Sequence, residues 1–343
     1  MAGVSAGTVD RVLHNRGNVS QESREAVERI LAEVEYKYNI HTSAISLRKE
    51  FRIVITTPTA EPGEYWGTVQ KGFEHALEEY SDIKIDCTFS YYNQFDVYSC
   101  RSTFAAIPAE KPDAVIIGPT FIDETRQLCR ALEVEGIPFV FVDSVIEGTN
   151  PVATYTTDQF ACGKLLGRIL RSMIPDEGAI AIFGARRIGN RQANNSLERK
   201  KGLMEYLTAP ETGCRVKEAS YSVLNPDENE CDVLDFLKDN PDVKGIAVMN
   251  SRGYIIADLL KSKGMDDIRV ASFDLTGNNR RCLEDGSIAA LLCQRPELQG
   301  FHAVKSVIGQ LLYKQNEQQV HHLMPIDIVL KENLPYYKEI FEG

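Results

Sequence analysis

The strongest constraint on the fold is a regular alternation that begins at Phe51. Short runs rich in β-branched residues are followed by polar turns and then by longer segments of helical periodicity. Such alternation is typical of β-α-β units with a largely parallel sheet. Helical periods are expected, for example, at 68–80, 160–173 and 253–264. Strands are expected at 51–58, 83–91, 113–119, 138–144, 179–185, 215–222, 244–250, 268–274 and 288–294. The fold class is therefore α/β.

These strands are too many for one compact doubly wound sheet, so we expect two lobes of four to six strands each. A break is expected near 150–156, where TNPVATYTT is extended and no helix precedes the next unit. Each doubly wound sheet opens a crevice at the carboxyl ends of its strands. The sequence therefore predicts a ligand held between two lobes.

Composition excludes several classes of protein. The chain has 343 residues, 43% of them hydrophobic, and a net charge of -11 from 38 basic and 49 acidic side chains. Residues 1–50 hold seven basic and seven acidic side chains, so the excess of acid lies in the rest of the chain. A surface that grips nucleic acid or an anionic membrane over its whole extent would need a basic excess. A small local patch that reads DNA remains compatible with these numbers.

Targeting and redox signals point to the cytoplasm. The first residues are polar and glycine-rich, and no window approaches 18 uninterrupted apolar residues, so we expect neither export nor a membrane partner. The eight cysteines are scattered without a C-x-x-C pair. We expect them to be reduced thiols of a cytoplasmic protein, mostly in its core.

The first forty residues differ in kind from the rest. Ser5 is placed to cap a helix in 4–15, and Ser20 is placed to cap a second helix in 21–36. Both segments carry apolar residues at helical spacing, and a glycine-bearing turn joins them. Two such helices fit part of a DNA-reading helical module. On spacing alone, a helical extension that packs on the body fits equally well.

The residues of this head then carry a resemblance. AGVSAGTVDRVLHNRGNVSQESREAVERILAEVEYKYN (2–39) resembles the DNA-binding head of the lactose- and galactose-repressor family, with its G-V-S, T-V, R-V-L-N, V-S and R-x-x-V pattern. The body from Phe51 to about Leu330 resembles the two-lobed, periplasmic-binding-protein-like core of the same family. The resemblance implies a head at 1–38, a hinge segment at 39–50 and an effector-binding core at 51–343. It places the N-lobe at about 51–154 and 295–323, and the C-lobe at about 155–290 and 324–343.

The resemblance also implies which residues meet operator DNA. The recognition helix runs from Ser5 to about Leu13, with an arginine able to donate two bonds to guanine. The hinge segment inserts an apolar side chain into the minor groove. The candidate DNA-binding residues are Ser5, Ala6, Gly7, Thr8, Arg11, Asn39 and Ile45. Tyr38 stands where a proline is usual in the family.

One departure from the family pattern affects the head. Family heads begin with a helix of roughly ten residues before G-V-S, whereas Met1 and Ala2 directly precede Gly3 here. We therefore expect a helix-turn-helix head that lacks its usual first helix, with Val4, Val9 and Val12 exposed. The expected consequence is weak operator binding and a gene start that lies upstream.

Candidate effector-binding residues follow from strand ends and from the resemblance. Arg199 lies in R-x-x-G-L, which matches the cleft arginine of the family, and is the strongest single candidate. An aromatic face can cover a sugar ring, and strand-end carboxylates and amides can bind its hydroxyls. The alternatives are a lobe-surface anchor for the aromatics and strand-end caps for the polar residues. The set is Tyr65, Trp66, Asp143, Ser144, Arg199, Asn250, Asp274 and Gln294.

No catalytic motif or metal-ligand spacing stands out, so we expect neither an enzyme nor a cofactor. The sequence predicts a homodimeric, DNA-binding transcription regulator with a neutral or weakly acidic sugar-like effector. Dimerisation is expected because two heads must meet two operator half-sites. The alternatives are a solute receptor without DNA activity and a sugar-modifying enzyme.

Overall fold

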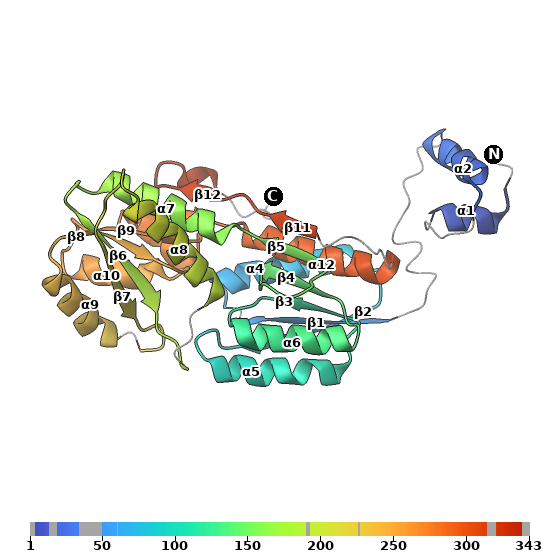
Figure 1. The fold of residues 1–343 in the computed structure, drawn as a ribbon, viewed down its shortest axis with the longest axis horizontal. Coiled ribbons are helices and arrows are strands. Elements are labelled where there is room, and N and C mark those ends of the chain that lie inside the picture. Colours follow the sequence, from blue (N-terminus) through green and yellow to red (C-terminus); the bar gives the residue numbers. More distant parts are fainter. Residues whose placement is uncertain are drawn as a thin grey trace.

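A computed structural model describes residues 4–13, 19–33, 50–59, 61–189, 193–225, 227–313 and 320–337. From Phe51 onward these residues form two α/β lobes, each built around a six-stranded sheet (Figure 1). The α/β fold class with two doubly wound sheets is confirmed.

The first lobe has the strand order β11-β5-β4-β3-β1-β2, and its paired strands are all parallel. Its strands are β1 (Phe51–Pro58), β2 (Ile85–Tyr92), β3 (Ala114–Ile117), β4 (Phe139–Asp143), β5 (Ala153–Thr156) and β11 (Val320–Leu323). Its helices are α4 (Tyr65–Glu79), α5 (Val97–Ala106), η1 (Ile107–Glu110), α6 (Ile122–Val134) and α12 (Pro296–Tyr313).

The second lobe repeats this order as β12-β10-β9-β8-β6-β7. Its strands are β6 (Ala179–Ala185), β7 (Val216–Tyr221), β8 (Val243–Val248), β9 (Arg269–Phe273), β10 (Ala290–Cys293) and β12 (Asp327–Val329). Its helices are α7 (Gln159–Met173), α8 (Asn194–Thr208), α9 (Glu228–Asp239), α10 (Gly253–Ser262), α11 (Gly277–Asp285) and η2 (Leu334–Tyr336). Strand β12 runs antiparallel to β10, so this sheet is mixed at one edge.

Both faces of each sheet are covered, which explains the continuous apolar runs in the sequence. Ile53 and Ile55 of β1 face the side covered by α4 and α12, while Val54 faces the side covered by α5 and α6. In the second lobe, α9, α10 and α11 cover one face and α7 and α8 the other. Helices on both sides of a sheet leave the carboxyl ends of its strands free for a site.

The lobe boundary differs from the expected one. We placed it between 154 and 155, within a break at 150–156, but 153–156 form β5, which pairs along its length with β4 and β11. The chain therefore crosses to the second lobe after Thr156. The extended residues of the expected break are buried strand residues, because β5 lies between two neighbours. Strands β11 and β12 were not predicted.

In the head, α1 (Ala6–Leu13) and α2 (Gln21–Glu33) pack against each other (Figure 1). The expected caps are present, since the Thr8 amide donates to Ser5 Oγ over 3.2 Å and the Ser23 amide donates to Ser20 Oγ over 3.3 Å. The expectation that Val12 is exposed is wrong: Val12 is 7% exposed, and Val27 of α2 is buried as well.

Close helix packing positions α8, which carries Arg199. A Cβ atom added at Gly163 of α7 would lie 1.9 Å from the carbonyl oxygen of Arg199, and one at Gly202 would lie 1.9 Å from that of Phe160. Two helix backbones can approach this closely only where neither carries a side chain.

Replacing Gly163 by alanine is expected to lower the free energy of unfolding by about 1–3 kcal/mol, because the helices must separate. Gly309→Ala in α12 is the matched control, since nothing lies within 4 Å of its added Cβ. Urea unfolding of the two variants measures the difference, and equal stabilities would contradict the packing argument.

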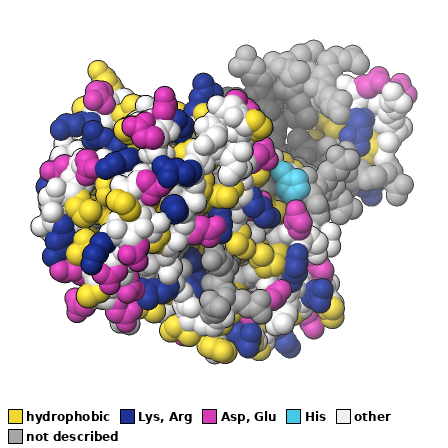
Figure 2. All heavy atoms as spheres, turned by 60° about the vertical axis from the view of Figure 1, so that its left-hand side comes forward, with side chains coloured by type: hydrophobic (Ala, Val, Ile, Leu, Met, Phe, Trp, Pro, Cys, Tyr) yellow, Lys and Arg dark blue, Asp and Glu magenta, His cyan; other side chains and the backbone are white. Residues whose placement is uncertain are grey.

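On the face shown in Figure 2, basic and acidic side chains are interspersed over the surface of the two lobes. Charged side chains also pair across the surface of the second lobe, as Lys244 does with Asp267 at 2.6 Å. None of the described helices is long and apolar enough to cross a lipid bilayer.

Candidate functional site

A small cavity lies between the two lobes at the carboxyl ends of their strands. The lining residues come from both lobes: Tyr65, Trp66, Gln94, Thr120, Asp143, Arg187, Ala193, Asn195, Arg199, Asn250, Ser251, Asp274 and Gln294. Among the eight predicted effector residues, all but Ser144 line this cavity.

Ser144 is turned away from the cavity. It is 1% exposed, and its Oγ accepts a hydrogen bond from Asn194 Nδ2 over 2.9 Å. Our expectation that Ser144 offers an acceptor to ligand hydroxyls stays a prediction: Ser144 does not line the cavity, and its oxygen already accepts one hydrogen bond from Asn194 of the opposite lobe.

The two aromatic residues form one wall of the cavity. The rings of Tyr65 and Trp66 meet edge to face, with centroids 5.3 Å apart. The indole also packs on Gly118, where an added Cβ would lie 2.4 Å from the ring. Trp66 is 6% exposed, so it belongs both to the lobe core and to the cavity wall.

Asp143 and Asp274 occupy equivalent places at the ends of β4 and β9. Both have backbone angles in the left-handed region, with φ of 70° for Asp143 and 63° for Asp274. Residues other than glycine rarely adopt this conformation, and such strain is concentrated at functional sites. The two turns direct both carboxylates into the cleft from opposite lobes.

Arg199 is held at the back of the cavity by neutral acceptors. It is 2% exposed and lies over the ring of Phe273 at 3.8 Å. Its guanidinium donates to Gln159 Oε1 over 2.7 Å, to Gln294 Oε1 over 3.0 Å and to the carbonyl oxygen of Met249 over 3.0 Å. These bonds fix its orientation and leave its charge to act on the two carboxylates.

Gln294 positions other groups. Its Oε1 accepts from Thr157, Gln159 and Arg199, and its Nε2 donates to both carboxylate oxygens of Asp274 over 3.0 and 3.1 Å. Since both polar atoms are used, Gln294 holds Asp274 and Arg199 in place. Asn250 differs, because its Oδ1 accepts from Tyr221 and from the Arg252 amide while no bond of its Nδ2 is seen among the described residues.

Burial raises the pKa of both carboxyl groups, and the charge of Arg199 opposes the increase. The pKa of Asp274 rises to about 7. Burial also raises the pKa of Tyr65 well above its usual value, with the charges of Asp143 and Asp274 adding to the effect. Asp143 and Tyr65 act on each other's pKa, yet within the described part of the chain neither Asp143 Oδ1 nor the Tyr65 hydroxyl makes a hydrogen bond of good geometry, although both atoms are buried. Buried polar atoms of this kind need a partner, which a bound ligand can supply.

The lobes are closed over this cavity by direct contacts. Asn195 Nδ2 of the second lobe donates to Asp143 Oδ2 over 3.1 Å. Further contacts between the lobes are the Ile188 amide to the Phe95 carbonyl at 2.7 Å, the Gly277 amide to the Gly63 carbonyl at 3.0 Å, and the Arg252–Glu64 ion pair at 3.2 Å.

Sequence reasoning missed several residues of the site. Gln94, Thr120, Arg187, Asn195 and Ser251 line the cavity but belong to no motif that we recognised. Gln94, Thr120 and Ser251 lie shortly after strands, so the strand-end argument could have found them. Gln159 and Gln299 are buried in the network behind the cavity, and no local sequence signal marks them.

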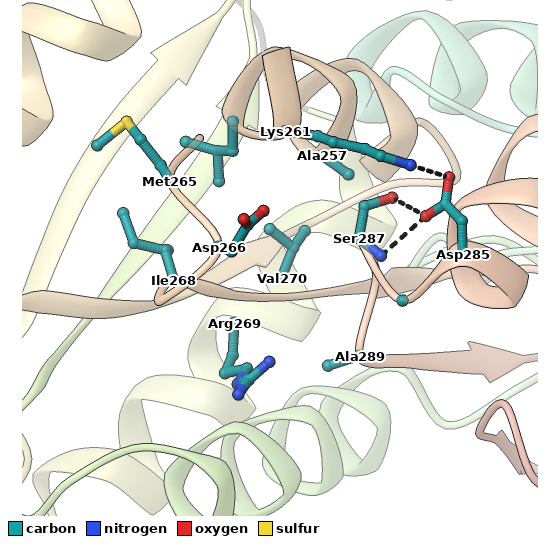
Figure 3. Close-up of a pocket in the computed structure, with 12 residues that line it drawn as sticks. Ala257, Lys261, Met265, Asp266, Ile268, Arg269, Val270, Asp285, Ser287 and Ala289 are labelled. Atoms are coloured by element: carbon teal, nitrogen blue, oxygen red, sulfur yellow. Dashed lines mark hydrogen bonds and ion pairs between the residues drawn. The ribbon is translucent and has the colours of Figure 1, made fainter. Parts of the chain in front are cut away.

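A second groove lies at the opposite end of the second sheet, where β9 and β10 begin (Figure 3). Its polar groups bind one another: Lys261 Nζ lies 2.7 Å from Asp285 Oδ2, and Ser287 donates to Asp285 Oδ1 over 2.6 Å. The cavity between the lobes has buried polar atoms without a hydrogen bond of good geometry among the described residues, so we place the candidate site there.

Five of the predicted DNA-binding residues lie in the described head. Ser5 precedes α1, and Ala6, Gly7, Thr8 and Arg11 lie within it, with Arg11 exposed. Asn39 and Ile45 lie outside the described residues. Within the described residues, no group of three or more His, Cys, Asp or Glu side chains is arranged to hold a metal ion.

Two family matches divide the chain as the fold does. Residues 1–39 match the bacterial regulatory proteins of the lacI family, and residues 53–315 match the periplasmic binding protein domain. A glucose-galactose binding protein of Geobacillus stearothermophilus shares the fold, with 21% identity, a TM-score of 0.73, and coverage of 84% of this chain and 100% of that one.

Two relatives are described as transcriptional regulators. The HTH-type transcriptional regulator DegA of Bacillus subtilis (strain 168) is 27% identical over 115 residues, which span 34% of this chain and only 33% of DegA. A crystal structure described as a LacI transcriptional regulator of Bacteroides fragilis is 31% identical, has a TM-score of 0.79, and matches 84% of this chain and 100% of that one. The chain therefore belongs to the lacI family of bacterial regulatory proteins, with a periplasmic-binding-protein domain as its core.

Proposed function

We propose that this protein is a cytoplasmic, homodimeric transcription regulator that binds operator DNA and responds to a sugar-like effector between its lobes. The observation that carries the effector half is the pair of strand-end aspartates, which line one cavity from opposite lobes together with Arg199, whose charge acts on both. Carboxylates and amides arranged in this way are suited to vicinal hydroxyls, and the Tyr65–Trp66 wall is suited to the apolar face of a ring.

Regulation follows from the position of the effector. A ligand that bridges Asp143 and Asp274 binds the closed lobes better than open ones. The difference between the effector's affinities for closed and for open lobes sets how far the effector can shift the spacing of the two heads in a dimer. In this proposal Tyr65, Trp66, Asp143, Arg199, Asn250 and Asp274 contact the effector, and Gln294 positions two of them.

A panel of monosaccharides tests whether the protein binds a sugar-like effector. The melting temperature of the protein is measured with each sugar, and each sugar is analysed after incubation. Stabilisation by a sugar that is recovered unchanged supports the proposal. Stabilisation by nucleobases or amino acids alone contradicts it, and conversion of the sugar would indicate an enzyme.

The DNA half predicts that Arg11→Ala weakens binding to a duplex enriched from a random library by about 10- to 100-fold, the usual effect of losing a bidentate contact to guanine. Arg24→Ala, which removes a positive charge from α2, is the control and should reduce binding far less. Fluorescence anisotropy at fixed salt measures both variants. Sugar binding without any sequence-specific enrichment of DNA would instead support a plain carbohydrate-binding protein.

A further inference from the structure

One cation of the cleft is not matched by an acidic side chain. Arg187 follows β6, lines the cavity and is partly buried. Its Nε donates to the carbonyl oxygen of Gln94 over 3.1 Å, and its Nη1 donates to that of Ala185 over 3.3 Å. Its guanidinium lies 5.4 Å from the centre of the Phe95 ring. No carboxylate pairs with Arg187 among the residues that the structure describes.

The surroundings of Arg187 add positive charge. Burial is the main cause that lowers the pKa of Arg187 to about 10; Tyr221 opposes this change and the positive charge of Arg252 adds to it. The charge of Arg252 is itself balanced, because Glu64 lies 3.2 Å away. A desolvated cation without a counter-ion is unfavourable, and an anion placed beside it would be stabilised.

Elsewhere in the cavity, acidic side chains outnumber basic ones. Asp143 and Asp274 share the single cation Arg199, which acts on the pKa of both. The cavity is therefore polarised, with two carboxylates around Arg199 in one region and an unmatched guanidinium in another. A neutral sugar would satisfy the carboxylates and leave Arg187 without a counter-ion.

We propose that the effector is a monosaccharide that carries an anionic group, a carboxylate or a phosphate, and that Arg187 binds this group. The hydroxyls of the sugar lie toward Asp143 and Asp274. This inference rests on the proposed function and narrows its ligand class. It also makes Arg187 a specificity-determining residue, because a guanidinium can give a carboxylate or phosphate two parallel hydrogen bonds.

The test is calorimetric titration with matched sets of sugars at pH 7.5. Each set holds a neutral hexose, its uronate and its 6-phosphate, for example glucose, glucuronate and glucose 6-phosphate, with the galactose and mannose series in parallel. At least one anionic member is expected to bind about tenfold or more tightly than its neutral parent. The uronate and phosphate arms show which anion is recognised.

Variants of Arg187 show whether its guanidinium recognises the anionic group or only packs against the ring of Phe95. Arg187→Gln is expected to lower the affinity for the anionic sugar by about 10- to 100-fold and to leave the affinity for the neutral parent nearly unchanged. The preference for the anionic sugar then disappears. Arg187→Lys should restore part of it. Arg186→Gln is the matched control: it removes the neighbouring positive charge, but Arg186 pairs with Asp232 and Glu228 and does not line the cavity.

Two outcomes overturn the inference and leave the proposed function standing. One is a neutral sugar that binds as tightly as its anionic counterparts. The other is an Arg187→Gln variant that weakens both members of a pair equally, since a role confined to holding the lobes together would do this. Failure of every sugar in the panel to bind overturns the proposed function and the inference with it.

Discussion

Replacing Arg199 by alanine is expected to abolish effector binding, with a loss of affinity of at least about 100-fold. The change removes the cation that acts on both Asp143 and Asp274, and it leaves the acceptors of Gln159 and Gln294 with fewer donors. Breaking a buried charge network by removing one member typically costs about 3–5 kcal/mol. Calorimetry with the tightest sugar of the panel measures the loss.

The same substitution is expected to lower the melting temperature, so folding must be checked by circular dichroism. Arg199→Lys provides a second measurement: it keeps the charge but not the planar fork that reaches three acceptors, and binding should fall while the fold is better preserved. Arg168→Ala, on the exposed side of α7, is the control and should leave both properties unchanged. Unchanged effector affinity in Arg199→Ala would remove this residue from the site.

The second large effect is expected for stability against pH, through Asp274. Its pKa is raised from 3.8 to about 7 in the folded protein, mainly by burial. Between these two values the folded state binds more protons than the unfolded state, so this group lowers the free energy of unfolding as pH rises, and the loss is complete above pH 7. Asp274→Asn removes the ionisation. The variant should gain a few kcal/mol relative to the wild-type protein between pH 5 and pH 8.

Urea unfolding at intervals of pH measures this difference without effector. Asp267→Asn is the matched control from the same lobe. Asp267 is exposed and hydrogen-bonded to Lys244, which lowers its pKa, so its replacement should give no such gain. A constant difference between Asp274→Asn and the wild-type protein from pH 5 to pH 8 would show that Asp274 ionises normally in the cleft.

Local pattern predicted the elements well, because each strand and helix is specified by its own residues. The run FRIVITTP is β1 over its full length, and AIAIFGA is β6. The short strands β11 and β12 escaped prediction, since VHHL and DIV carry no pattern of their own and become strands by pairing with β5 and β10. For the same reason, β5 was taken for a connection between lobes.

The candidate site divides in a similar way. Parallel strands end at the same edge of a sheet, so the residues that follow them could be grouped from the sequence, as Asp143, Asn250 and Asp274 were. Which way each side chain turns could not be predicted. Ser144 follows the same strand as Asp143, yet it bonds to Asn194 outside the cavity.

What the sequence determined by itself was the α/β class, the two lobes, the capped head helices and a polar cleft at the strand ends, because periodicity, caps and strand ends are properties of neighbouring residues. Only the tertiary structure decided the closure of the lobes, the left-handed turns at both aspartates and the glutamine network behind Arg199. It alone also decided that Arg187 faces the cavity without a carboxylate partner among the described residues. These properties depend on distances between residues far apart in the chain, such as the 156 positions between Asp143 and Gln299, and local sequence carries no record of such distances.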